Sequence, residues 1–442
     1  VLVLLLCFLP LLLLHAVGIS PRSIPDAVGV GSGLTAKLVC SGYFLSGLSE
    51  AQGLADVASY SPAANVVSLA RRGVDTFVAD IAGYGTAIAR HYPGLGCTLQ
   101  YPDAPSFESL EVPRYAVGSG DWPVGEDVGA YSRPVQRLLQ ELMDDDNEAG
   151  LDTRALLVVQ GGSVVAELYA EGFAADTPLL GWSMAKSVTA MLLGRQEALG
   201  LVQAGETGLF PEWKADARSS ISLQDLLQMS SGLDFDEPYV PGSDSTRMLF
   251  LSPSAAAVAL QSPAAHPPGE HFYYSSGTTN LLAYLAWRRV GANTQAMLDF
   301  FARELAAPVG LRRATFELDA SGVYLGSSFL YAPARDWARL GLLMLNDGVV
   351  GDTRLLPEGW MTRATTPNAS ANDPRYGYQF WLNGGGDELR WPDLDPDAYA
   401  MLGNRGQVVM MLPDRQALIV RLGWTAGDYP ANARLARVQA LL

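Results

Sequence analysis

The sequence predicts an α+β fold in which one sheet is built from strands of two distant segments. Two β-rich runs flank Gly161 and Gly162 in "ALLVVQGGSVVAELYAEG", a two-residue turn typical of a hairpin. Apolar strand-like runs return near the end of the chain, at 398–424. Between them, residues of about 202–348 show mostly helical spacing of apolar side chains. Strands on both sides of a helical middle indicate a single sheet with an inserted, mainly helical subdomain.

Each helix and each of the last strands is predicted by a short segment of its own. "VQRLLQELM" before the hairpin predicts an amphipathic helix, and 183–199 after it predicts a helix rich in Ala, Met and Leu. Helical spacing recurs in "ISLQDLLQM", "TTNLLAYLAWRRV", "TQAMLDFFARELA" and "PARDWARLGLLMLNDG". The last strands are expected in "AYAMLG", "GQVVMML" and "ALIVRLGW", followed by a helix in "ANARLARVQALL".

Length and composition limit the classes of function. The chain has 442 residues, 49% hydrophobic and 17% charged, which is typical of a large globular protein. Its formal net charge of −16 argues against nucleic-acid binding, which requires a basic face. We therefore expect no nucleic-acid partner.

The first residues, "VLVLLLCFLPLLLLHAVGIS", are apolar over 1–14 and end in small residues. This length suits the apolar region of a signal peptide better than a full bilayer span. We expect 1–19 to be a signal peptide or a membrane anchor. The protein would then be exported, and be periplasmic or membrane-anchored facing the periplasm.

Residues 20–125 are expected to form an N-terminal extension, and 126–442 the catalytic domain. The extension contains a strand-like "VDTFVADIAG" but no chemical motif, and a Gly/Pro-rich link, "YAVGSGDWPVGEDVGAYSRP", marks its end. Cys40 and Cys97 are the two cysteines outside the apolar N-terminal segment. In an oxidising compartment they are a candidate disulfide, and two buried free thiols are the alternative.

The chain has only three lysines among its 30 basic residues: Lys37, Lys186 and Lys214. Lys186 lies in "GWSMAKSVTAMLLG", three residues after Ser183 and on the same face of the predicted helix. A serine hydroxyl needs a neighbour that takes its proton, and a partly desolvated lysine can do so whereas arginine cannot. The alternative is a lysine whose stem lies along a helix surface.

Two further motifs strengthen the functional interpretation. In "PPGEHFYYSSGTTNLLAYL", Tyr274 precedes a helix, and its phenol becomes a useful base only beside a cation such as Lys186. In "MLGNRGQVVMML", Gly403 and Gly406 open a strand, as expected where a backbone approaches a ligand closely. Alone, each motif is equally typical of an ordinary helix start or a β-turn.

Together these motifs resemble the serine β-lactamase-like hydrolases, over roughly 151–442. The segments that carry the resemblance are "WSMAKSVTAMLLG", "LLQMSSGLDFDEPY", "PGEHFYYSSGTTNLLAYL" and "GNRGQ". Within this superfamily the chain is most similar to class C β-lactamases, family VIII-type carboxylesterases and 6-aminohexanoate-dimer hydrolases. The resemblance implies a β-lactamase-like α+β fold with an antiparallel sheet flanked by helices.

The resemblance also implies roles for the residues of the first two motifs. Ser183 would be the acylated nucleophile and Lys186 the partner that tunes its pKa. Tyr274 would be the general base, and Ser276 the third member of the Tyr-x-Ser/Asn element. No cofactor or metal is implied.

The remaining site residues come from the pocket loop and the last strands. Tyr239 matches a pocket-loop tyrosine of the dimer hydrolases. The backbone N–H groups of the nucleophile and of Gln407 would form the oxyanion hole. The Lys-Thr-Gly triplet of the β-lactamases is aligned with Asn404, Arg405 and Gly406. Because Asn404 replaces the lysine that helps to hold a substrate carboxylate, we expect carboxylic esters or linear amides as substrates.

Other functions and other hydrolase folds are alternatives to this interpretation. β-Lactamase or D-alanyl peptidase activity is one, and a non-catalytic penicillin-recognising protein is another. Gly181 to Ala185 also approximates the nucleophile elbow of α/β-hydrolases, but no histidine follows His271 to complete a triad. Four scattered histidines without H-E-x-x-H give no ligand set for a metal hydrolase.

Overall fold

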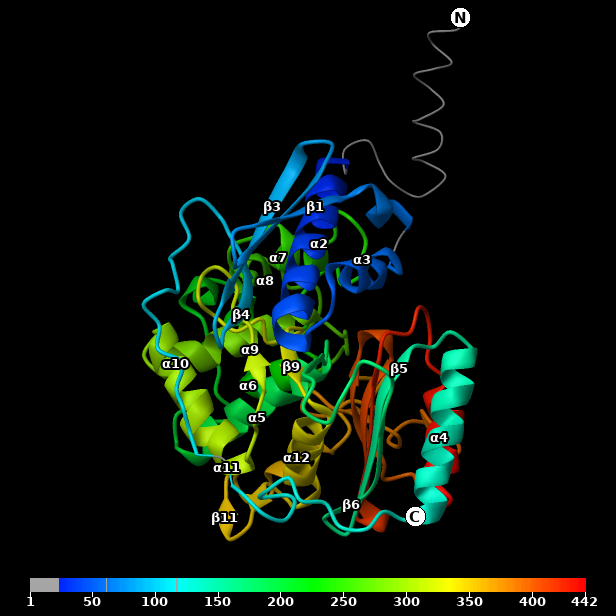
Figure 1. The fold of residues 1–442 in the computed structure, drawn as a ribbon. Helices are drawn as coiled ribbons and strands as arrows, with labels where there is room; N and C mark the ends of the chain where they lie inside the picture. Colours follow the sequence, from blue (N-terminus) through cyan, green and yellow to red (C-terminus); the bar gives the residue numbers. More distant parts are fainter. Residues whose placement is uncertain (1–23, 61, 117) are drawn as a thin grey trace, which may run out of the picture.

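The computed structural model describes residues 24–60, 62–116 and 118–442; the predicted signal peptide or anchor at 1–19 lies outside them. Its centre is a six-stranded antiparallel sheet of order β12-β13-β14-β15-β5-β6 (Figure 1). The strands are β5 (Thr153–Gln160), β6 (Ser163–Tyr169), β12 (Trp381–Leu382), β13 (Tyr399–Gly403), β14 (Gln407–Leu412) and β15 (Ala417–Gly423).

The two distant segments meet where β15 pairs with β5, placing Ile419 opposite Val158. The β5–β6 hairpin turns at Gly161 and Gly162, whose φ angles of 56° and 79° glycine adopts without strain. The predicted sheet from both ends of the catalytic region is therefore confirmed. All its strand pairs are antiparallel, which excludes the mainly parallel sheet of an α/β-hydrolase.

Helices cover both faces of this sheet (Figure 1). On one face, α4 (Arg133–Glu148) and α14 (Ala431–Gln439) pack their apolar side chains against those of β5 and β15. On the other face lie α12 (Ala334–Leu345) and α5 (Met184–Ala198). The buried sheet thus fixes the start of α5, which carries the predicted nucleophile.

The helical subdomain is a set of short, capped helices. Serine or asparagine side chains accept a backbone N–H at the starts of α6, α7, α8, α9 and α10, as expected of N-caps. Its elements are η3 (Pro211–Trp213), η4 (Ala217–Ser220), α6 (Leu223–Leu227), α7 (Asp244–Phe250), α8 (Ala255–Ala259), α9 (Ser276–Arg289), α10 (Thr294–Phe301), the π-helical turn η5 (Ala302–Ala306) and α11 (Ala307–Val309).

Smaller elements complete the chain around these layers. A three-stranded sheet has the order β7-β9-β8, and β10 and β11 form a separate hairpin. Their bounds are β7 (Leu179–Leu180), β8 (Thr315–Phe316), β9 (Leu330–Ala332), β10 (Val349–Val350), β11 (Thr353–Arg354), with helix α13 (Trp360–Ala364) and the turns η6 (Asn404–Gly406) and η7 (Pro413–Arg415). Leu179 and Leu180 directly precede the nucleophile segment, so this small sheet helps to position it.

The extension folds as two helices and a second, four-stranded antiparallel sheet. These are α2 (Ile24–Ser46), α3 (Glu50–Ala58), the turn η2 (Pro62–Val66), β1 (Ser68–Arg72), β2 (Thr76–Ile81), β3 (Tyr84–Tyr92) and β4 (Gly96–Leu99). Cys40 of α2 and Cys97 of β4 are joined by a disulfide, with their Cα atoms 6.1 Å apart. The bond ties the helix to the sheet that it covers.

Helix α2 is long and apolar enough to cross a membrane, but 61% of its most apolar stretch is buried inside the protein. Its buried side chains belong to the same hydrophobic core as those of the helical subdomain. Lys37 of α2 forms an ion pair with Glu317, N–O distance 2.6 Å, in which both side chains are almost wholly buried. In this fold α2 is a core helix, so it gives only weak support for the predicted export.

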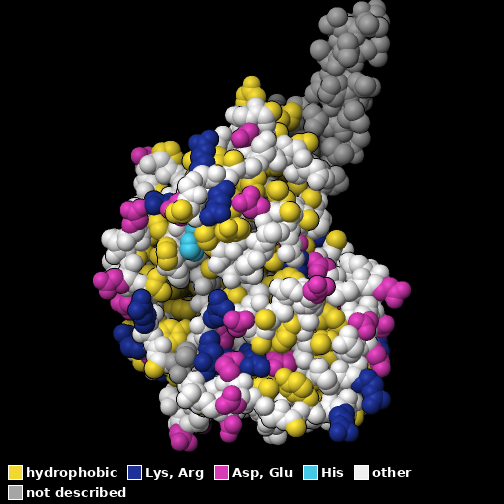
Figure 2. Space-filling model, viewed as in Figure 1, with side chains coloured by type: hydrophobic (Ala, Val, Ile, Leu, Met, Phe, Trp, Pro, Cys, Tyr) yellow, Lys and Arg dark blue, Asp and Glu magenta, His cyan; other side chains and the backbone are white. Residues whose placement is uncertain are grey.

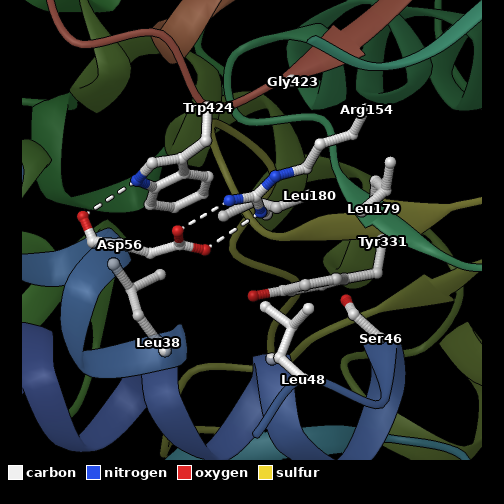
Figure 3. A pocket seen from close by; sticks show the side chains of 12 residues that line it. Leu38, Ser46, Leu48, Asp56, Arg154, Leu179, Leu180, Tyr331, Gly423 and Trp424 are labelled. Atoms are coloured by element: carbon white, nitrogen blue, oxygen red, sulfur yellow. Dashed lines mark hydrogen bonds and ion pairs between the residues drawn. The ribbon is translucent and has the colours of Figure 1, made fainter. Parts of the chain in front are cut away.

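Helix α3 is attached to the catalytic region by a second buried ion pair. Asp56 of α3 faces Arg154 of β5 in a two-pronged arrangement, with N–O distances of 2.6 and 2.9 Å (Figure 3). The indole N–H of Trp424 donates to the Asp56 carbonyl oxygen at 2.8 Å. A small cavity of about 30 Å³ lies beside them. The extension therefore packs into the catalytic region, and the proposed boundary at residue 125 stays a prediction.

Candidate active site

Ser183 lies at the N-cap of α5, where its side chain is partly exposed. The preceding Trp182 has φ 48°, an uncommon conformation for a residue with a side chain. Its indole is held among the rings of Phe329, Trp424 and Tyr60, with centroids 5.7 to 6.0 Å away. This packing fixes the turn that presents the serine.

Lys186, one helical turn after Ser183, is 1% exposed and at the centre of the cluster. Its Nζ donates to the Ser183 Oγ at 3.2 Å, the Ser276 Oγ at 3.0 Å and the Ser327 carbonyl oxygen at 3.0 Å. Burial lowers the pKa of Lys186 to about 8, although the negative charge of Glu237 opposes this change. With a pKa of about 8 the amine would gain or lose a proton near neutral pH, and its part in a reaction stays a prediction.

Tyr274 is the second titratable group beside the nucleophile. Lys186 Nζ lies 4.9 Å from the centroid of its ring, and Trp381 stacks on the ring at 5.0 Å. Burial raises the pKa of Tyr274 well above its usual value, and the neighbouring Ser183 hydroxyl only partly offsets this. Tyr274 is therefore a neutral phenol when Lys186 titrates.

Ser276 begins α9 and connects the lysine to an acidic residue. Its hydroxyl and its backbone N–H both donate to the Glu237 carboxylate, each at 2.6 Å. The Tyr239 hydroxyl lies 3.2 Å from the same Oγ. Burial raises the pKa of Glu237, whereas Lys186 lowers it. Ser183, Lys186, Tyr274, Ser276 and Tyr239 are thus brought together, as the resemblance implied.

The turn between β13 and β14 forms another side of the site. A side chain at Gly403 would clash with the Gly181 carbonyl oxygen, so the close contact at this glycine is with the segment before Ser183. The predicted approach to a ligand stays a prediction. Asn404, next to it, is exposed and donates to the Tyr60 hydroxyl at 3.2 Å. Gly406 has φ 76°, which suits a glycine in this tight turn.

Gln407 is paired with Gly403 across the hairpin, and its side chain is directed away to the Gly423 carbonyl oxygen at 2.5 Å. Its backbone N–H as an oxyanion donor stays a prediction.

Sequence reasoning missed three residues that the structure adds to the site. Glu237 lies inside the quoted "LDFDEPY", where its position before Tyr239 was an available signal. Trp381 follows a loop, and only its stacking on Tyr274 reveals it. Tyr60 comes from the extension, and no sequence motif marked it.

A family model described as beta-lactamase matches residues 135–442. The chain belongs to this family. It is therefore an enzyme of the serine hydrolase superfamily that shares the β-lactamase-like α+β fold. The extension, residues 24–60 and 62–116 of the described chain, lies before the matched region.

Individual proteins agree with this assignment. A 6-aminohexanoate-dimer hydrolase of Paenarthrobacter ureafaciens is 25% identical over 292 residues, which are 62% of this chain and 74% of that protein. A penicillin-binding protein homolog from Caulobacter crescentus has a TM-score of 0.56 and 17% identity, over 72% of this chain and all of the other. A family VIII carboxylesterase has a TM-score of 0.53 and 16% identity, with the same coverage. These structural similarities support the fold.

Proposed function

We propose that this member of the beta-lactamase family hydrolyses carboxylic esters or linear amides through an acyl-enzyme on Ser183. The observation that carries the proposal is the Lys186 amine, buried and 3.2 Å from the Ser183 Oγ. No carboxylate contacts that amine directly among the described residues, so burial leaves it titratable near neutral pH.

The proposed base system is Lys186 with Tyr274. Because the pKa of Lys186 lies far below that of Tyr274, the neutral amine is the group able to accept the serine proton. The Tyr274 phenol then relays that proton to the leaving group. In this proposal Lys186 accepts the serine proton first, whereas the sequence led us to expect Tyr274 as the base. Both residues still take part in the same proton transfer.

The proposed reaction has two steps, acylation of Ser183 and hydrolysis of the acyl-enzyme. Ser183 Oγ attacks the substrate carbonyl carbon and loses its proton to the base system, and the developing oxyanion is bound by backbone N–H groups. The bond to the leaving alcohol or amine breaks, and the leaving group takes the proton. Water then attacks the acyl carbon, which releases the acid and restores the Ser183 hydroxyl.

Asn404 supports esters and simple amides over β-lactams. Its amide oxygen accepts from the Arg405 N–H at 2.8 Å, and its amide nitrogen donates to Tyr60 at 3.2 Å. An uncharged side chain with both ends occupied is a poor partner for a substrate carboxylate. We therefore expect nitrocefin, which carries a carboxylate, to be a poor substrate.

The test combines labelling with kinetics. A fluorophosphonate probe should modify the peptide that contains Ser183, and Ser183→Ala should abolish hydrolysis of p-nitrophenyl butyrate. Ser187→Ala is a matched control, because Ser187 lies on the same helix and its hydroxyl donates to the Gln379 carbonyl oxygen instead. Full activity of Ser183→Ala would overturn the proposal. Labelling of Ser183 without turnover would favour the binding protein.

A further inference from the structure

Arg405 is a buried cation in the turn between β13 and β14, next to Asn404. Its side chain is 6% exposed, and it forms no ion pair with an acidic residue in the part of the chain that the structure describes. Its Nη1 donates to the Thr425 carbonyl oxygen at 3.4 Å, and its Nε has no hydrogen-bond partner in that part of the chain. The nearby Asp56 is already engaged by Arg154. A buried guanidinium with an unused donor is costly unless another group compensates.

The compensating group is Tyr60, which comes from the extension. The Arg405 guanidinium carbon lies 3.5 Å from the centroid of the Tyr60 ring, a close cation–π contact. The indole of Trp424 lies farther from the same cation, at 5.9 Å. The Tyr60 ring therefore covers the face of the guanidinium and separates it from solvent.

Tyr60 also borders the active site. Its hydroxyl accepts from the exposed Asn404, whose neighbour Gly403 lies against the nucleophile segment. Its ring packs edge-on against Trp182, with centroids 5.9 Å apart. The tyrosine is held in this place because the buried Asp56–Arg154 pair fixes α3, which ends two residues before it.

We propose that Tyr60 covers a latent anion-binding position at Arg405 and thereby directs the enzyme toward uncharged esters and amides. The proposal rests on the proposed function, since it concerns selectivity among substrates that acylate Ser183. A guanidinium binds a carboxylate strongly when its donors are accessible. With the ring in place, a substrate carboxylate meets only the neutral Asn404 and the tyrosine.

Two matched substrate pairs test this selectivity. One pair carries the charge on the acyl side: p-nitrophenyl hydrogen glutarate and its methyl ester. The other carries it on the leaving group: 4-acetoxybenzoate and methyl 4-acetoxybenzoate. For each pair the readout is the ratio of kcat/KM for the anion to kcat/KM for the neutral ester. A ratio cancels changes in the amount of active enzyme.

Tyr60→Ala should raise the ratio in at least one pair by about 10-fold or more, because a charge-assisted hydrogen bond becomes available. Tyr60→Phe keeps the ring and should leave the ratio within about 3-fold of wild type, the scale of one neutral hydrogen bond. In Tyr60→Ala/Arg405→Gln the gain should disappear. Tyr84→Ala replaces an exposed tyrosine elsewhere in the extension. It is the control for losing a tyrosine ring away from Arg405, and its ratio should match that of wild type.

An unchanged ratio in both pairs for folded, active Tyr60→Ala would overturn the proposal, as would a gain that survives Arg405→Gln. If Tyr60→Ala does not fold, Tyr60→Leu uncovers part of the guanidinium and should give a smaller gain of the same sign; no gain there counts against the proposal. Failure of the proposed function is distinguishable, because hydrolysis would then persist in Ser183→Ala.

Discussion

Lys37 and Lys186 are both almost completely buried, yet their surroundings differ in one respect. Lys37 contacts the Glu317 carboxylate directly at 2.6 Å, whereas Lys186 contacts hydroxyl and carbonyl oxygens. The carboxylate nearest to Lys186 in its network, Glu237, is reached only through Ser276. Burial lowers the pKa of both amines, but only Lys37 has a contacting anion that holds its charge in place.

Under the proposed function, this difference lets the same residue type serve a structural purpose at Lys37 and a catalytic one at Lys186. A directly paired ammonium joins two parts of the molecule, here the extension and the catalytic region. An ammonium held by neutral acceptors keeps a proton that it can exchange, which catalysis requires. The third lysine, Lys214, is exposed, so its substitution serves as a control for the two buried lysines.

The largest expected effect is on stability, and it tests the structural role of the Lys37–Glu317 ion pair. Lys37→Met should lower the free energy of unfolding by about 3–5 kcal/mol, because Glu317 is left as an uncompensated buried carboxylate. Urea unfolding followed by circular dichroism measures this change. Lys37→Met/Glu317→Gln should recover much of the loss, and Lys214→Met should be nearly neutral. A stability for Lys37→Met within 1 kcal/mol of wild type, on the scale of an exposed pair, would contradict the structural role.

The second effect tests the catalytic side. Lys186→Arg keeps a positive charge but cannot give up its proton, so kcat should fall about 100-fold or more, equivalent to about 2.7 kcal/mol. Tyr274→Phe should fall similarly, and the double variant should lose far less than the product of the two, since the residues act as a unit. Circular dichroism verifies folding. A folded Lys186→Arg enzyme within a few-fold of wild type would make the lysine a structural charge like Lys37.

The smallest expected effect is a shift in the pH dependence of kcat/KM. It tests how the Glu237 carboxylate, which does not contact Lys186 directly, changes the pKa of that amine. If neutral Lys186 is the base, kcat/KM should rise with pH and level off above about 8, where the amine is deprotonated. The negative charge of Glu237 favours the protonated amine, so Glu237→Gln should move this rise to lower pH. The other groups facing the amine are the Tyr274 ring, the hydroxyls of Ser183 and Ser276 and the Ser327 carbonyl oxygen.

Asp236→Asn is the matched control for that profile, because Asp236 is exposed and next to Glu237 in the chain. Its profile should stay close to that of wild type. A decline of kcat/KM through the same pH range, moved to lower pH by Glu237→Gln, would instead mean that the lysine acts as a cation beside a Tyr274 phenolate.

Local sequence determined much of this protein. The spacing of Ser183 and Lys186 places both on one helical face, and the Gly161–Gly162 turn specifies a hairpin, because each rests on contacts within a few residues. The same holds for the helix start at Ser275, whose side-chain oxygen accepts the backbone N–H of Thr278. A rare lysine among small and apolar residues was sufficient to single out position 186.

Only the tertiary structure decided what surrounds these residues. Lys37 and Glu317 are 280 positions apart, and Asn404 and Tyr60 are 344 apart, so no local pattern predicts either contact. Whether a buried amine is titratable depends on which distant group packs against it, because desolvation and charge act through space. The same reason explains why the extension carried no recognisable motif and still places Tyr60 against Asn404 and Trp182 of the candidate site.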